Sequence, residues 1–357
     1  MFQRTRCHDI HRGQHTHGSS GKCVQLKYSL GEEASMLWRK CQGLTQLQTR
    51  GLVAQESKRY IPRRAVLYVP GNDDRKLNKI PSLRADCIVM DCEDGVALSK
   101  KESARSKIHH VLHSKEIDFT GKDCSVRFNS VESGLCEADM QEILSAKYLP
   151  STIHLPKVDS PAHLEWFTDK LKFVMKGHNS SEKLRLIIFT ESAESLLSLP
   201  EICRRGVELS RDAPFDLDGI VFGSDDFCAD IGATRTNEAG ELTFARQYVV
   251  TVAKAFKLQA VDLVYIDYKD LDGLRTQSEE GAGMGFTGKQ VIHPDQVPVV
   301  QEAFSPRPEK VEWAASLVRA FEQHQQEGKG AFTFRGHMID MPLLLQARNV
   351  LQLASNT

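Results

Sequence analysis

From Arg63 onward the chain alternates short apolar runs with longer amphipathic segments. Most of the short runs are apolar on successive residues, which is typical of parallel strands covered on both faces. The segments between them, such as 99–114 and 241–256, have the pattern of helices. The eight runs are AVLYVPG (65–71), DCIVMDCEDG (86–95), CSVRFNS (124–130), TIHLPKV (152–158), LRLIIFTES (184–192), LDGIVFGSDD (217–226), QAVDLVYID (259–267) and GFTGKQVIHP (285–294).

Eight strand–helix units over residues 63–300 predict an α/β fold of the (β/α)8 TIM-barrel type, which usually takes about 250 residues. We therefore assign residues 59–300 to a catalytic barrel domain. The alternative is an open doubly wound sheet. That fold would need a glycine-rich phosphate loop after the first strand, and VPGNDDRK (69–76) is not one.

Residues 301–357 are predicted to be a C-terminal extension. Residues 305–330 have the pattern of one amphipathic helix. AFTFRGHMID (331–340) has two short strand-like pieces around a glycine, and Pro342 suits the first turn of a last helix. The extension is too small to fold alone, so we expect it to act as a lid on the barrel and as a subunit contact.

Residues 1–58 differ from the rest of the chain, with nine Lys/Arg against four Asp/Glu and no strand pattern. We interpret them as a disordered leader. Residues 36–58 are basic, poor in acids and weakly amphipathic, which predicts a mitochondrial transit peptide and a location in the matrix. Met36 is then the working start codon, and 1–35 are not usually made; a linker without function is the alternative. Four histidines could ligate a metal, although a polar tail is the simpler interpretation: His8, His11, His15 and His17.

The overall composition excludes several classes of protein. A net charge of −1 with 41% hydrophobic residues is typical of soluble globular proteins and gives no sign of a nucleic-acid partner. There is no uninterrupted apolar run near the ~20 residues that cross a bilayer, so no membrane partner is expected. The nine cysteines include no C-x-x-C pair, which argues against a disulfide framework and a zinc site.

Polar side chains gather where the predicted strands end. In a barrel, the carboxyl ends of the strands form the active site. Ten ionisable or phenolic groups at eight strand ends are too many to be explained as helix caps alone. They are Tyr68, Glu93, Asp94, Arg127, Lys157, Glu191, Asp225, Asp226, Asp267 and His293.

Two carboxylates from neighbouring predicted strands suggest a metal site. Glu191 ends the fifth run and Asp226 the sixth. Two carboxylates plus waters suit Mg²⁺, which prefers octahedral oxygen coordination. The alternative is that these acids only cap the following helices; Asp225 could be such a cap, or a partner of the metal ligands.

Two basic groups suggest anionic ligands. Arg127 ends the third run and could clamp a carboxylate or stabilise an oxyanion; alternatively it only neutralises Glu93 and Asp94, one strand away. Arg75 and Lys79 are four residues apart and would share a helix face, where they could hold the phosphates of a nucleotide-like cofactor. A solvated helix face explains the spacing of Arg75 and Lys79 equally well.

Seven motifs in this order resemble the citrate lyase β-subunit and malyl-CoA lyase branch of the aldolase/citrate lyase family. The resemblance runs from about Tyr60 to the end of the chain, and the segment GKGAFTFRGHMIDMPLL (328–344) is similar to the animal mitochondrial members. The motifs are RRAVLYVPGND, DCEDGV, VRFNS, LPKV, FTES, FGSDDF and GFTGKQVIHP.

The resemblance implies a Mg²⁺-dependent barrel enzyme, usually a homotrimer, that cleaves citramalyl-CoA to acetyl-CoA and pyruvate. Its ligands would therefore be CoA thioesters and 2-oxo acids. Carried over by motif, Glu191 and Asp226 hold the metal, and Arg127 contacts the substrate. Asp340 in MIDMP matches the acid/base aspartate that one subunit inserts into its neighbour's barrel; taken without the family, Asp340 would be interpreted as a helix N-cap.

The resemblance also implies a coenzyme A path. Its residues are Tyr68, Arg75, Lys79, Ile292 and His293. Family members often have lysine where Arg75 stands, so the charge is kept but the phosphate geometry differs.

Two other functions remain open from the sequence. The enzyme could mainly make malate or methylmalate from acetyl- or propionyl-CoA and glyoxylate or pyruvate, because the same residues serve that synthase reaction. The chain could also be a CoA-binding protein without catalysis, which a neutral residue at 127, 191, 226 or 340 would have favoured; all four positions are charged.

Overall fold

The computed structural model describes residues 60–178, 182–326, 332–339 and 341–355. The expectations for the leader, its histidines and the transit peptide lie outside the described residues, as does Asp340. Within the described ranges, no helix is both long and apolar enough to cross a membrane.

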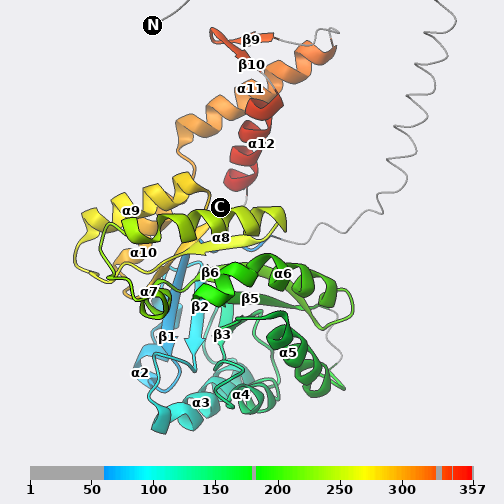
Figure 1. The fold of residues 1–357 in the computed structure, drawn as a ribbon, viewed down its shortest axis with the longest axis vertical. Helices are drawn as coiled ribbons and strands as arrows, with labels where there is room; N and C mark the ends of the chain where they lie inside the picture. Colours follow the sequence, from blue (N-terminus) through cyan, green and yellow to red (C-terminus); the bar gives the residue numbers. More distant parts are fainter. Residues whose placement is uncertain (1–59, 179–181, 327–331, 340, 356–357) are drawn as a thin grey trace, which may run out of the picture. The chain divides into compact units, whose positions relative to one another are not determined.

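Eight parallel strands close into a barrel in the order of the sequence, which confirms the TIM-barrel prediction and rules out the open sheet (Figure 1). All five residues of the second strand and all four of the fourth and eighth are buried, as expected for strands covered on both faces. The strands are β1 (Ala65–Pro70), β2 (Cys87–Asp91), β3 (Asp123–Arg127), β4 (Thr152–Leu155), β5 (Leu184–Thr190), β6 (Phe215–Phe222), β7 (Gln259–Asp262) and β8 (Gly288–Val291).

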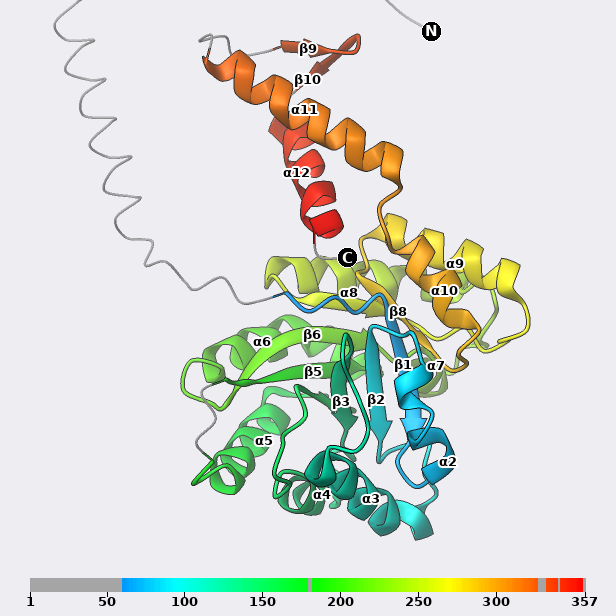
Figure 2. The ribbon, with the colours of Figure 1, turned by 180° about the vertical axis from the view of Figure 1, so that it is seen from behind.

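Helices cover the outside of the strands (Figures 1 and 2). Local signals fix their ends: Ser192 caps one helix, and Gly285 ends another at a φ of 105° that favours glycine. The last of them runs past the expected boundary at 300 to Ala303. The helices are α2 (Asp74–Leu77), α3 (Lys101–Ser114), α4 (Cys136–Ile143), α5 (Pro161–Val174), α6 (Ala193–Leu209), α7 (Ser224–Ile231), α8 (Thr243–Ala255), α9 (Leu271–Met284) and α10 (Gln296–Ala303).

The barrel interior has an apolar middle and a charged floor. The middle is built from inward-facing residues such as Val66, Ile187 and Val221. At the amino ends of the strands, the fully buried Arg63 pairs with Asp123 at 2.5 Å and Asp218 at 2.7 Å. Because buried charges are tolerated only when they are paired, this floor is a structural element.

The C-terminal extension has a hydrophobic cluster of its own. It consists of α11 (Pro308–Gln326), the antiparallel hairpin β9 (Phe332–Phe334) and β10 (His337–Ile339), and α12 (Met341–Ser355). Its cluster includes Leu317, Ile339 and Val350. These elements confirm the predicted helices and hairpin, whereas the roles as lid and subunit contact remain predictions.

Candidate active site

A cavity of about 690 Å³ opens at the carboxyl ends of the barrel strands. Of the nine site residues predicted from the sequence, it brings together all eight that the structure describes. They are Tyr68, Arg75, Lys79, Arg127, Glu191, Asp226, Ile292 and His293. The cavity is also lined by Asp94 and Asp225 of the ten predicted strand-end groups, but not by Glu93, Lys157 or Asp267.

Arg127 lies at the end of β3 in a dense set of ion pairs. Its Nε and Nη2 donate to the two carboxylate oxygens of Asp91, each at 2.7 Å, and its Nη1 lies 2.9 Å from Glu93 Oε2. Burial alone would lower the pKa of Arg127, but Asp91 and Glu93 together raise it well above its ordinary value. The guanidinium also lies over the ring of Tyr68, 4.9 Å from its centre. Arg127 is thus a rigid, permanently charged group at the cavity wall.

Asp91 is a site residue that the sequence analysis missed. The expected partners Glu93 and Asp94 do contact Arg127, but Asp91 makes the bidentate pair. The alternation along the second strand could have identified Asp91. Cys87 and Val89 face the barrel interior, and Asp91 continues their two-residue period. An acid on the inner face of a strand needs a cation nearby, which Arg127 supplies.

Glu191 and Asp226 are not helix caps. The cap of α6 is Ser192, whose side chain accepts from Ser195 N, and the cap of α7 is Gly223. Asp226 lies in the first turn of α7, as does Asp225, which faces Arg235 at 3.8 Å. The capping interpretation is therefore wrong, and both carboxylates of the predicted pair are available for a ligand.

The environment of Glu191 disfavours its negative charge. Burial, and then the charges of Glu93 and Asp226, raise the pKa of Glu191 to about 8. One oxygen of Glu191 accepts from the main-chain N–H of Lys157 at 2.7 Å. Asp226 acts directly on Glu191, and two interacting acids repel each other unless a proton or a cation lies between them.

This donor set fits a hard divalent cation. Both donors are carboxylates, and Gly223 leaves the space next to Glu191 that a Cβ would fill, at 2.5 Å from Oε2. In the described part of the chain, no group of three or more His, Cys, Asp or Glu could hold a metal. Mg²⁺ suits such a site, because it usually keeps several waters and takes one or two carboxylates.

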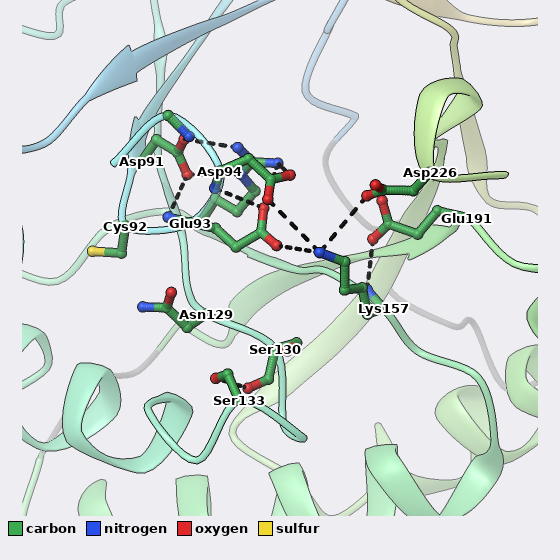
Figure 3. Close-up of polar contacts among 12 residues, drawn as sticks. Asp91, Cys92, Glu93, Asp94, Asn129, Ser130, Ser133, Lys157, Glu191 and Asp226 are labelled. Atoms are coloured by element: carbon green, nitrogen blue, oxygen red, sulfur yellow. Dashed lines mark hydrogen bonds and ion pairs between the residues drawn. The ribbon is translucent and has the colours of Figure 1, made fainter. Parts of the chain in front are cut away.

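Lys157 is a further site residue. The sequence analysis placed it at a strand end but gave it no role. Its ammonium lies 2.9 Å from Glu93 Oε1 and 3.7 Å from Asp226 Oδ2, so it reaches both the arginine cluster and the acid pair (Figure 3). Its neighbours raise its pKa although burial lowers it, so it stays a cation.

The outer part of the cavity is basic and partly apolar. α2 ends at Leu77, so Arg75 and Lys79 do not share a continuous helix as expected, yet both line the cavity. Across the cavity, the exposed Ile292 precedes His293, whose ring stacks on Tyr268 with 4.8 Å between centres. Cations beside flat and apolar side chains suit a phosphorylated ligand with an aromatic group.

The chain is similar to several known proteins. The human protein named mitochondrial citramalyl-CoA lyase is 51% identical, over 90% of this chain and 94% of its own. A (3S)-malyl-CoA thioesterase of Cereibacter sphaeroides is 31% identical, over 81% of this chain and 94% of its own. CitE of Mycobacterium tuberculosis, solved with magnesium, acetoacetate and coenzyme A, has a TM-score of 0.62 at 26% identity, covering 82% of this chain and 98% of that one.

A sequence model of one family matches residues 64–294, which contain all eight strands of the barrel. This agrees with the family resemblance that the seven motifs indicated. The chain belongs to the HpcH/HpaI aldolase/citrate lyase family.

Proposed function

We propose that this protein is a Mg²⁺-dependent lyase that cleaves citramalyl-CoA to acetyl-CoA and pyruvate. The observation that carries the proposal is that one cavity is lined by an acid pair, by Arg127 and by basic groups. The human relative at 51% identity bears the name of this activity. CitE, with magnesium and coenzyme A in its complex, supports the same ligands here.

The reaction breaks the bond between the carbon that carries the hydroxyl group and the methylene next to the thioester. The hydroxyl gives its proton to the acid/base group and becomes the keto oxygen of pyruvate, and the electron pair of the broken bond goes to the acetyl-CoA enolate. Mg²⁺ held by Glu191 and Asp226 would stabilise negative charge on the substrate oxygens.

The chain's own residues orient the substrate. Arg127 keeps one N–H, on Nη2, beyond those given to Asp91, Glu93 and Asp94, and this group would bind the carboxylate of the keto acid. Arg75 and Lys79 would hold the phosphates of coenzyme A, with Tyr68, Ile292 and His293 along its path. Asp340, by its motif, would protonate the enolate at carbon.

The proposal extends to the assembly that the family resemblance implies and to the location in the cell. We expect a homotrimer in which the C-terminal extension of one subunit brings Asp340 to the barrel of another. The human, rat and mouse relatives are all named mitochondrial, and this supports mitochondrial import of the present chain.

The test is cleavage of citramalyl-CoA by the full chain, with Mg²⁺ or with EDTA, beside Glu191→Gln and Asp340→Ala. We expect acetyl-CoA and pyruvate in equal amounts only with Mg²⁺, and loss of turnover in both variants. Asp340→Ala should still bind coenzyme A. A wild-type protein that binds coenzyme A but releases no acetyl-CoA would overturn the proposal in favour of a binding protein.

A further inference from the structure

Lys157 has a backbone conformation that its residue type disfavours. It follows β4 by two residues and has a φ of 54°, in the left-handed region. A side chain with a Cβ loses roughly 1–2 kcal/mol there, so the surrounding contacts have to hold it. This conformation lets the N–H of Lys157 donate to Glu191 while its side chain reaches Glu93.

The ammonium of Lys157 lies among three carboxylates. It is 2.9 Å from Glu93, and 3.7 Å from both Asp94 and Asp226 (Figure 3). Lys157 therefore contacts both acids of the proposed metal site: Asp226 through its side chain, and Glu191 through its main chain.

Glu93 and Asp94 connect Lys157 to Arg127. Glu93 uses Oε1 for Lys157 and Oε2 for Arg127, and Asp94 likewise gives one oxygen to each cation. A change in the position of the ammonium therefore changes the forces on the guanidinium. The metal acids and the substrate arginine are two parts of one network, and Lys157 lies between them.

We propose that Lys157 is a positioning residue that shares Asp226 with the metal ion and links occupancy of the metal site to Arg127. This inference rests on the proposed function, because it needs a cation between Glu191 and Asp226. A divalent ion at Asp226 repels the ammonium, which then shifts its contact toward Glu93 and Asp94. Those two acids share their charge with Arg127, so Arg127 gains freedom to bind the substrate carboxylate.

The proposal predicts effects of opposite sign for Lys157→Met. Metal binding should tighten about fivefold, the size expected when one partly exposed charge near a divalent ion is removed. Turnover at saturating metal should fall about tenfold, since Glu93 and Asp94 would then keep their full charge on Arg127 and leave it less free to bind the substrate carboxylate. Lys157→Arg keeps the charge, so its metal affinity should stay within about twofold of wild type.

The experiment measures Mn²⁺ binding to the full-length protein by electron paramagnetic resonance and by calorimetry, without substrate. Mn²⁺ takes the same oxygen ligands as Mg²⁺. Lys170→Met is the matched control. It removes an ammonium of similar exposure that pairs with Glu137 on the outer helices, 2.8 Å away, so it should change neither affinity nor kcat. Circular dichroism and thermal unfolding verify that each variant is folded.

The outcomes separate the two proposals. Wild-type protein that binds no Mn²⁺ overturns the metal site itself. If wild type binds Mn²⁺ and Lys157→Met binds it equally or more weakly, the inference fails while the proposed function stands. If Lys157→Met does not fold, two neutral polar variants give the same comparison. Lys157→Gln also removes the charge, and Lys157→Asn does so with a residue that tolerates the left-handed conformation. Tighter metal binding with slower turnover supports the inference, because a merely structural lysine would not tighten binding.

Discussion

Gly223→Ala tests whether the position of Glu191 controls the site. The new methyl group would lie 2.5 Å from Glu191 Oε2 and 2.7 Å from its Cβ, whereas ordinary contact begins at 3.4 Å. The φ of Gly223 is −85°, so alanine causes no backbone strain there. The effect of the substitution therefore comes from the displacement of Glu191.

The size of the effect follows from that distance. The carboxylate has to move by about 0.9 Å to restore ordinary contact. A displacement near 1 Å in a catalytic constellation costs about 100-fold in rate. Crowding of this kind costs about 1–3 kcal/mol of stability, so we expect a folded but nearly inactive variant.

The assay measures kcat/KM for acetyl-CoA release and the affinity for Mn²⁺, beside Gly283→Ala as control. Gly283 has no atom within 4 Å of its added Cβ, so that variant should keep full activity. Wild-type activity and metal affinity in Gly223→Ala would refute the assignment of Glu191. Loss of both in Gly283→Ala as well would show that the assay reports general damage.

Three further predictions concern stability. Arg127→Met should lower the free energy of urea unfolding by about 3–5 kcal/mol, because the buried Asp91 loses its cation; a loss well under 1 kcal/mol would contradict this. In EDTA, stability should fall as the pH rises towards 8, since folded Glu191 keeps its proton up to about pH 8 and the unfolded chain releases it near 4.5. In thermal unfolding experiments, the stability of Glu191→Gln should fall less steeply with pH than that of the wild type. Equal slopes for the two proteins would contradict the raised pKa of Glu191. Gly283→Ala, at an exposed position in α9, should raise the unfolding free energy by about 0.5 kcal/mol, and lower stability would contradict the helix assignment.

The sequence predicted the barrel because its strands are buried on both faces, so their apolar runs contrast clearly with the amphipathic helices between them. It predicted the shared cavity for a geometric reason: parallel strands in a closed sheet bring their carboxyl ends together. Residues as distant as Tyr68 and His293 could therefore be assigned to one site without any contact being known.

The two contacts that the sequence did not predict depend on backbone conformation and strand register, which no local sequence pattern shows. Nothing in LPKV indicates that Lys157 adopts a positive φ and reaches across the barrel mouth to Glu93 and Asp226. The pairing of Arg127 with Asp91 depends on the register between β2 and β3, which places the two residues opposite each other. The sequence located all eight strands, although each predicted run extends one to five residues past the end of its strand, and it did not show the pairing register.

The charged floor of the barrel limits where the folded chain can begin. Arg63 comes two residues before β1 and supplies the charge that Asp123 and Asp218 face. Any shortening of the chain ahead of the barrel has to stop on the amino side of Arg63, because losing this buried cation would cost about 3–5 kcal/mol. Two ion pairs at the end opposite the active site thus limit how far the chain can be shortened before the barrel loses its stability.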